Sequence, residues 1–373
     1  MANGFADGPA QALRDYLVGR GARVVAISHP LTPENGTRHV IAEYAAGERV
    51  HERTVRLPVR PPLSFLLDPL VPLVPPTVDA WFGFNPLASA RGLVARRRGR
   101  AKHVVLWSVD FVPDRFGKGT AATRVYDRID RLCCKRVDAR IELSEAARDG
   151  RSRRHKLAQD AAPAHVVPMG AWLDRVPTTP SDGFRRRRVA FLGHLVERQG
   201  VETLLESLAL LGRRGEAIEG DVVGTGPLEG ALREHAKRLG LESAVRFHGF
   251  VSDHREVERL LADASIGIAP YRPSDATFTR YADPGKLKAY LAAGLPIVLT
   301  DVPPNARELE REAGAEVVRF DPAALAGAVS RGLASAEDWA ARRDAALAYA
   351  RRFDWGILLP EALRKLGLDV VPA

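Results

Sequence analysis

The sequence is poor in cysteine: its 373 residues include two, and these are the neighbours Cys133 and Cys134. A disulfide between adjacent cysteines is strained and rare, so we expect two reduced thiols in a cytosolic protein. Two cysteines at this spacing do not form a zinc motif either. The sequence therefore predicts neither a disulfide framework nor a metal site.

Long apolar runs that could cross a membrane are also missing. The most apolar region, residues 57–84, contains seven prolines, which a transmembrane helix does not accommodate. The first ten residues are polar and rich in glycine, unlike a secretory signal. We therefore expect a cytoplasmic protein. Its Pro-rich segment at 62–77 is either an irregular buried segment or a loop that faces an acceptor or a membrane.

Acidic residues do not balance the basic ones in the first half of the chain. Residues 1–180 hold 28 Lys and Arg against 18 Asp and Glu, whereas residues 181–373 hold 27 against 28. The excess is densest at 96–100 and 148–156. A solvated surface and attraction to an anionic partner, such as lipid phosphate at the inner face of a membrane, both remain open. No aromatic residues interleave with these basic runs, so nucleic acid is not an expected partner.

What the sequence has in abundance is an alternation of short apolar strands with amphipathic helices. A chain of this length fits two domains, and the alternation breaks at residues 172–188. Continuous apolar strands between helices indicate parallel sheets covered on both faces. We expect an α/β protein with two doubly wound, Rossmann-like domains, at residues 1–175 and 176–352, and a final helix within 353–373.

The expected strands begin only after the first helix. Residues 1–10 look like a loop that enters a helix over 9–20, so either the first sheet lacks its first strand or the true chain starts earlier. The strands predicted in the first domain are 23–28, 103–108, 139–144 and 165–169, and those in the second are 188–192, 220–223, 245–250, 266–270, 296–300 and 315–320.

One predicted helix start has the properties of an anion-binding site. Asp283 is a typical N-cap, Pro284 a typical first helical residue, and Gly294 ends the helix. Gly285 permits close backbone approach and Lys286 can pair with a phosphate, next to free amides and the positive end of the helix dipole. Asp283 could alternatively contact a sugar or ribose hydroxyl.

Two lysines on this helix cannot share one site. Lys286 and Lys288 lie about 200° apart around the helix axis, because each residue turns the helix by about 100°. We expect Lys286, nearer the helix start, to face the anion, and Lys288 to be an exposed surface lysine.

Four motifs follow one another in the second half of the chain: Phe191-Leu-Gly-His, Asp221-Val-Val-Gly-Thr-Gly, Val245-Arg-Phe-His-Gly-Phe-Val and Ala262 to Tyr271. In this order they make residues 188–355 similar to glycosyltransferases of the GT-B fold, specifically the retaining enzymes of glycosyltransferase family 4. Arg352-Phe-Asp-Trp355 also resembles that family, in which a final helix crosses back to the N-terminal domain. The resemblance implies a metal-independent transfer, with retention, from a UDP- or GDP-linked sugar to a hydroxyl acceptor, without a cofactor.

The resemblance also assigns roles in the C-terminal domain. Gly193, Gly224 and Gly226 would let backbone amides approach the diphosphate. His248, Gly249 and Val251 match the strand end that contacts the base and ribose. The positive charge that offsets the diphosphate would come from residues other than the family's usual ones. These are Lys286, Arg198 or a protonated His194.

The departures from the family pattern concentrate on charged positions. His194 and Gln199 stand where members usually carry Arg and Lys, and Tyr281 and Ala289 stand where they carry paired glutamates. The Asp-Pro-Gly-Lys form at 283–286 is similar to a divergent branch of bacterial surface-polysaccharide and natural-product transferases. A catalytically silent domain that binds a nucleotide sugar or a partner is therefore the alternative, and a sugar-nucleotide epimerase ranks third.

The acceptor side is expected in the N-terminal domain. Asp110 follows the strand 103–108, with Arg115 close to it in sequence, so it either orients the acceptor hydroxyl, contacts the donor sugar or caps its own loop. Asp7 and Gly8 are the expected loop that faces the donor.

Overall fold

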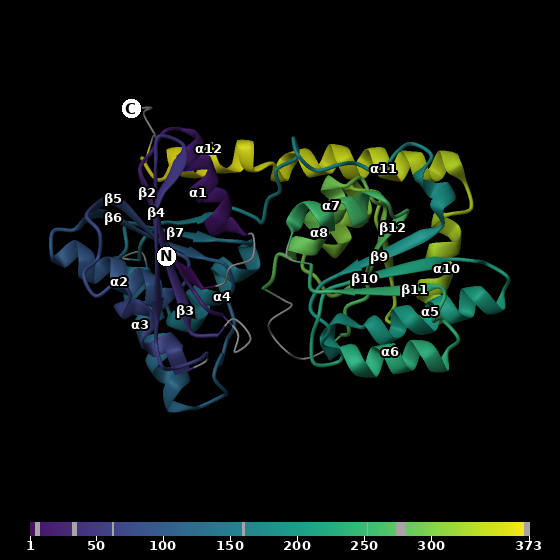
Figure 1. The fold of residues 1–373 in the computed structure, drawn as a ribbon, viewed down its shortest axis with the longest axis horizontal. Coiled ribbons are helices and arrows are strands. Elements are labelled where there is room, and N and C mark those ends of the chain that lie inside the picture. The colour runs from purple at the N-terminus through teal and green to yellow at the C-terminus, as the bar shows by residue number, and fades with distance from the viewer. Residues whose placement is uncertain are drawn as a thin grey trace. The chain divides into compact units, whose positions relative to one another are not determined.

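The computed structural model describes residues 1–3, 8–31, 36–61, 63–158, 161–251, 253–273 and 281–368. The chain divides into two compact units, Met1–Pro168 with Gly356–Ala373, and Met169–Trp355 (Figure 1). The division falls at residues 168 and 355 rather than at the 175 and 352 expected from the sequence. The last segment of the chain thus belongs to the N-terminal unit.

The C-terminal unit, Met169–Trp355, is a doubly wound parallel sheet with the strand order β11-β10-β9-β12-β13-β14. All six strands predicted for this half are present. They are β9 (Arg188–Leu192), β10 (Glu219–Val223), β11 (Val245–Gly249), β12 (Ile266–Ala269), β13 (Ile297–Thr300) and β14 (Glu316–Val318). The helices are α5 (Val201–Arg213), α6 (Glu229–Arg238), α7 (His254–Ala262), α8 (Gly285–Ala292), α9 (Ala306–Glu312), α10 (Pro322–Gly332) and α11 (Ala336–Ala350).

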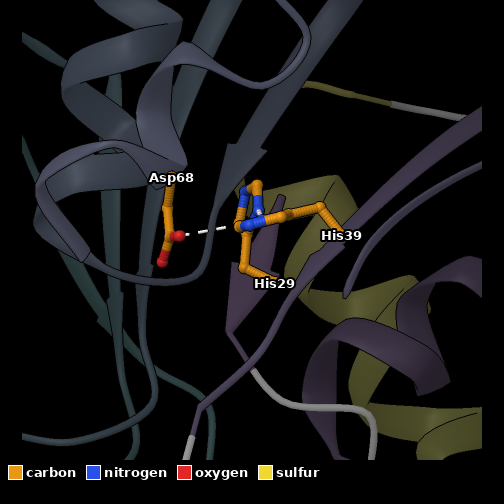
Figure 2. A group of neighbouring side chains, drawn as sticks. All are labelled: His29, His39 and Asp68. Atoms are coloured by element: carbon orange, nitrogen blue, oxygen red, sulfur yellow. Dashed lines mark hydrogen bonds and ion pairs between the residues drawn. The ribbon is translucent and has the colours of Figure 1, made fainter. Parts of the chain in front are cut away.

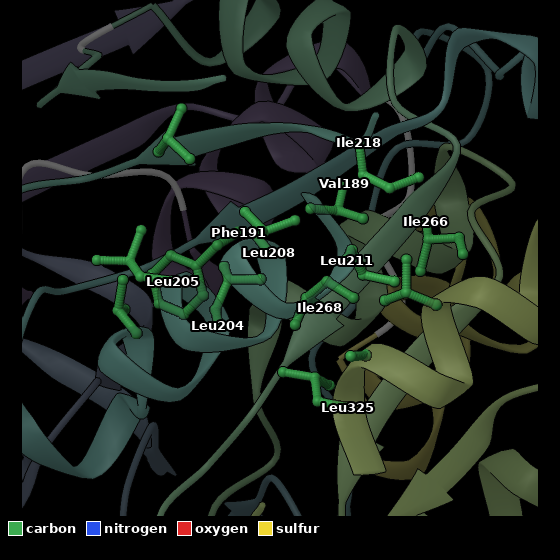
Figure 3. Close-up of a cluster of buried hydrophobic side chains, with 14 of the residues drawn as sticks. Val189, Phe191, Leu204, Leu205, Leu208, Leu211, Ile218, Ile266, Ile268 and Leu325 are labelled. Carbon is green, nitrogen blue, oxygen red and sulfur yellow. The ribbon is translucent and has the colours of Figure 1, made fainter. Parts of the chain in front are cut away.

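Alternate residues of the central strand β9 enter two different cores. Val189 and Phe191 pack with Leu204 in the cluster that α5 covers, which Figure 3 shows. Ala190 packs with Leu287 of α8 in the cluster on the opposite face. Both faces of β9 are therefore covered, as its uninterrupted apolar sequence predicted.

The N-terminal unit contains two four-stranded sheets, β1-β2-β3-β4 and β5-β6-β7-β8. The second sheet is parallel throughout, but β3 and β4 form an antiparallel hairpin, which corrects the expectation of parallel strands alone. The strands are β1 (Ala2–Asn3), β2 (Val24–His29), β3 (Arg38–Ala45), β4 (Glu48–Arg56), β5 (Val78–Gly83), β6 (Ala101–Ser108), β7 (Ala139–Glu142) and β8 (Ala164–Val166). The helices are α1 (Pro9–Gly19), α2 (Pro86–Arg97), α3 (Ala121–Arg136), α4 (Glu145–His155) and α12 (Trp355–Lys365).

The expectation that no strand precedes the first helix is wrong. Ala2 and Asn3 pair in parallel with Ser28 and His29 of β2, and the Phe84 amide donates to the Met1 carbonyl. A two-residue strand is too short to show a periodicity, so the sequence pattern does not reveal it. Beside it lies a cavity of about 940 Å³, lined by residues of α1, β2, β5 and the C-terminal segment.

The Pro-rich segment is partly buried and partly exposed. It forms two short 3₁₀ turns, η2 (Leu63–Leu66) and η3 (Asp68–Leu70). Asp68 and Val71 are buried, whereas Leu73 is 78% exposed and Val74 64%. The buried residues fit the interpretation of an irregular buried segment, whereas a loop that faces an acceptor or a membrane stays a prediction. Within the described ranges, no helix combines the length and apolar character needed to cross a bilayer.

Candidate functional site

Helix α8 is held against the ends of two central strands by one buried tyrosine. The Tyr290 hydroxyl donates to the Ile268 carbonyl at 3.1 Å and accepts from the Leu192 amide at 2.8 Å. Gly267 makes room for the ring, because a Cβ there would lie 2.6 Å from it. This anchor fixes the start of α8 near the carboxyl end of β9, the usual ligand-binding edge of such a sheet.

The prediction that Asp283 caps this helix is wrong. Pro284 occupies the N-cap position and no side chain caps α8, which begins at Gly285. The Asp283 carboxylate instead accepts from the Met169 amide at 2.7 Å and lies 3.3 Å from the Lys288 ammonium. A tertiary partner far away in the sequence therefore takes the carboxylate from the helix amides.

The prediction that Lys288 is an exposed lysine is also wrong. It is 3% exposed, and its Nζ lies 3.3 Å from the centroid of the Phe353 ring in addition to its ion pair with Asp283. Burial lowers its pKa, and the Asp283 charge opposes that shift. The helix does separate the two lysines as expected, but the side away from Lys286 is protein interior rather than solvent.

The Lys286 ammonium has a different environment. Its Nζ donates to Gln199 Oε1 at 2.5 Å and lies over the rings of Phe191 at 4.0 Å and Tyr271 at 4.9 Å. Burial, with a further contribution from the charge of Arg198, lowers the pKa of Lys286 well below its usual range. Among the described residues, these contacts with Lys286 are a neutral amide and two π faces, none of which cancels its charge.

Gly193 opens directly onto this ammonium. Its φ of 149° lies in the region that favours glycine, and a Cβ there would lie 3.0 Å from Lys286 Nζ. Gly224 and Gly226 are required for another reason, because a Cβ at either would lie within 2.4 Å of the carbonyl oxygens of Gly193 and Leu195. The three glycines therefore pack two strand-end turns against each other, with Gly193 facing the lysine.

The remaining predicted residues of this unit lie around the same strand ends. His248 Nε2 is 2.7 Å from Asp221 Oδ1, and the Gly249 carbonyl accepts from the Gly224 amide. Val251 is half-buried, while His194, Arg198 and Gly285 are exposed. Among the described residues, a Cβ at Gly285 would meet only Met169, at 3.6 Å, so these residues leave the helix start open. Sequence reasoning missed Phe191 and Tyr271, since the pattern marks both simply as apolar.

In the N-terminal unit, Asp110 forms an ion pair with Arg115, as their spacing allowed. The Asp110 backbone carbonyl accepts from Arg151, which is 2% exposed and pairs with the buried carboxylates of Asp130 and Glu142. This buried network behind Asp110 was not predicted. Gly8 is the N-cap of α1 with extended backbone, and within the described part of the chain a Cβ there would touch Gln11, at 3.7 Å. Asp7 lies outside the described residues.

Several arginines of the two dense basic runs are paired within the unit. Arg96 pairs with Asp138, Arg148 with Glu145 and Asp149, and Arg154 with Asp114 and Asp127. Much of the local positive charge is therefore compensated by neighbouring carboxylates.

These features coincide with a known class of protein. Residues 186–335 match the family described as "Glycosyl transferases group 1", and the fold is that of GT-B glycosyltransferases. The chain therefore has the GT-B fold, and residues 186–335 are similar to the group 1 glycosyl transferases.

Two curated relatives make the likeness more specific. The amylovoran biosynthesis glycosyltransferase AmsK of Erwinia amylovora is 27% identical over 151 residues, which are 39% of this chain and 37% of that protein. The alpha-D-kanosaminyltransferase of Streptomyces kanamyceticus is 23% identical over 315 residues, 70% of this chain and 74% of that protein. The match thus spans little more than a third of the first relative's length.

Solved structures show the fold over most of the chain. HepE of Anabaena, crystallised in complex with UDP, superposes with a TM-score of 0.62 and 18% identity over 78% of both chains. Sucrose-phosphate synthase of Thermosynechococcus elongatus superposes with a TM-score of 0.68 and 16% identity, over 95% of this chain and 92% of that one.

Proposed function

We propose that this protein transfers a sugar, with retention of anomeric configuration, from a nucleotide-diphosphate sugar to a hydroxyl acceptor in polysaccharide, glycolipid or natural-product biosynthesis. The Lys286 ammonium carries the proposal: it is desolvated, lies beside the Gly193 turn, and has the open N-terminus of α8 next to it. A site that holds an uncompensated cation among neutral groups favours an anion. The names of the kanosaminyl and amylovoran relatives and the UDP complex of HepE support the reaction class and a UDP-linked donor.

The proposed mechanism assigns the leaving-group charge to Lys286 and to the backbone amide of Gly285 at the start of α8. As the bond between sugar and diphosphate breaks, negative charge grows on the departing phosphate, and fixed cations lower the energy of that state. The acceptor hydroxyl attacks from the face that the diphosphate leaves, and the diphosphate takes its proton. Asp110, paired with Arg115, is the proposed orienting group for the hydroxyl. We assign no step to a metal ion or cofactor.

The proposal is tested by replacing Lys286 with alanine. Removing one such donor of charge typically lowers turnover by about 10²–10³-fold, and we expect a loss in this range in transfer or donor hydrolysis. Lys237→Ala, at an exposed position in the last turn of α6, is the matched control and should keep full activity. Unchanged turnover in Lys286→Ala, with a normally folded protein, would remove the lysine from the mechanism.

A second function, a silent domain that binds a nucleotide sugar without transferring it, is favoured by one observation. Gly224 and Gly226 are crowded by the protein's own backbone rather than left open for a ligand. Nucleotide binding with neither transfer nor hydrolysis, across UDP- and GDP-sugars, would support it. Transfer to any acceptor would exclude it.

We also propose that the basic N-terminal unit binds peripherally to an anionic membrane. The positive excess of residues 1–180 supports it, while the ion pairs within that unit oppose it. Flotation with anionic liposomes at low and high salt tests it, because screening weakens attraction between exposed charges. No binding at low salt would contradict it.

A further inference from the structure

Three buried ligand-type side chains converge in the N-terminal unit, and none of them has a role in the site described above. His29 is the last residue of β2, His39 lies near the start of β3, and Asp68 begins η3. Their exposures are 0%, 0% and 3%. Figure 2 shows both imidazole rings and the carboxylate turned toward one another.

One hydrogen bond joins the two imidazole rings, and none from the described residues reaches the Asp68 oxygen beside them. His29 Nδ1 and His39 Nδ1 are 2.8 Å apart, and His39 Nδ1 is 3.7 Å from Asp68 Oδ1, too far for a hydrogen bond. Within the described part of the chain, Asp68 Oδ1 and the Nε2 atoms of both histidines have no hydrogen-bond partner. A buried carboxylate oxygen without a hydrogen-bond partner is costly, so Asp68 Oδ1, which lies 3.7 Å from His39 Nδ1, calls for a cationic ligand.

We propose that His29 Nδ1, His39 Nδ1 and Asp68 Oδ1 bind one divalent transition-metal ion, with zinc as the first candidate. Two imidazoles and a carboxylate are typical zinc ligands. At zinc–ligand distances of about 2.0–2.1 Å, two ligands of a tetrahedral site lie roughly 3.3 Å apart. The separations of 2.8 and 3.7 Å lie on either side of this value. The ligand atoms all lie within 4.8 Å of one another, so an ion fits after sub-ångström shifts.

Two neighbouring asparagine side chains orient the Asp68 carboxylate. Asn3 Nδ2 donates to Asp68 Oδ2 at 2.7 Å, and Asn85 Nδ2 donates to Asn3 Oδ1 at 2.8 Å. These two amides hold the Asp68 side chain by one oxygen and leave Oδ1 directed at the imidazoles. Groups that orient a ligand in this way are a regular part of metal sites.

The metal would act on the structure of the N-terminal unit. Its three ligands come from β2, β3 and the Pro-rich segment, so one ion would link the β2–β3 hairpin to η3. None of the three ligands has a role in the sugar transfer proposed above, and the Lys286 site belongs to the other unit.

The test uses the full-length chain without any nucleotide. After removal of metal with a chelator and dialysis, zinc is titrated against a chromogenic competitor, and cobalt is titrated while its visible absorption is recorded. We expect one ion per chain, a cobalt spectrum of nitrogen and oxygen ligands, and a lower melting temperature after chelation.

Two variants and one control identify the ligands. His39→Gln and Asp68→Asn should each weaken zinc binding by at least about tenfold. His103→Gln, at an exposed position on β6, should bind as the wild type does. Absence of stoichiometric zinc and cobalt binding by the wild type would overturn the proposal, as would unchanged affinity in both ligand variants. The wild-type cobalt spectrum decides the matter if the variants fold poorly.

Discussion

Helix α8 buries two lysines two residues apart, and the comparison between them separates structure from function. Lys288 faces a carboxylate, Asp283, and has almost no exposed surface. The Lys286 ammonium is desolvated as well, although part of the residue remains exposed, and it faces an amide and two rings. A paired buried ion is a structural element, whereas an unpaired one has an unfavourable free energy that an anionic ligand can relieve.

The largest stability effect is expected at the paired lysine. Lys288→Met would leave the Asp283 carboxylate buried without its cation, which typically costs about 3–5 kcal/mol. Urea unfolding of the wild type and the variant measures the loss. The double variant Asp283→Asn with Lys288→Met should recover most of it, because no unpaired charge is left. A single variant as stable as the wild type would show that the ion pair is not a structural element.

How far the sequence predicts this arrangement depends on whether contacts are local. The six strands of the C-terminal unit were predicted because each carries short apolar residues between helical stretches. Strand β4 was missed because eight of its nine residues are exposed and it has no apolar alternation. Asp283-Pro284 fits a cap pattern locally, yet the carboxylate binds Met169, 114 residues away, and Lys288. Helical spacing separated the two lysines correctly but could not tell interior from solvent.

The same reasoning applies to the cluster in the N-terminal unit. His29, His39 and Asp68 are spread over 40 residues and follow no known metal-binding spacing, so the sequence predicted no metal site. They meet because the β2–β3 hairpin brings the histidines together and η3 folds over them. The fold, and not the spacing of the residues in the sequence, brings these three side chains together.

A second prediction moves the charge at the Lys286 site instead of removing it. Because Lys286 Nζ touches Gln199 Oε1, a lysine at 199 would place an ammonium at nearly the same point. We expect Gln199→Lys, added to Lys286→Ala, to raise turnover at least about tenfold above that of Lys286→Ala alone. This gain corresponds to roughly 1.4 kcal/mol of transition-state stabilisation. Gln199→Ala in the same background is the control and should restore nothing. If the lysine at 199 restores nothing either, the position of the charge along α8 is essential.

The smallest predicted effect is a difference in pH dependence. The folded pKa of Lys286 lies well below that of the unfolded chain, near 10.4, so between the two values the unfolded state binds more protons. The free energy of unfolding of the wild type should therefore rise with pH in this window, by at most about 1.4 kcal/mol per pH unit. Lys286→Met removes this contribution, and Lys237→Met, at an exposed position, should keep it.

A bound nucleoside diphosphate sharpens this last prediction. An anion beside Lys286 raises the pKa of the lysine toward its unfolded value, which narrows the window in which stability rises with pH. We expect saturating UDP or GDP to flatten the wild-type profile and to leave that of Lys286→Met unchanged. Urea unfolding at a series of pH values, with and without nucleotide, measures both profiles. Identical slopes for the wild type and Lys286→Met without nucleotide would mean that the ammonium is not desolvated, and the contrast with Lys288 would then lose its physical basis.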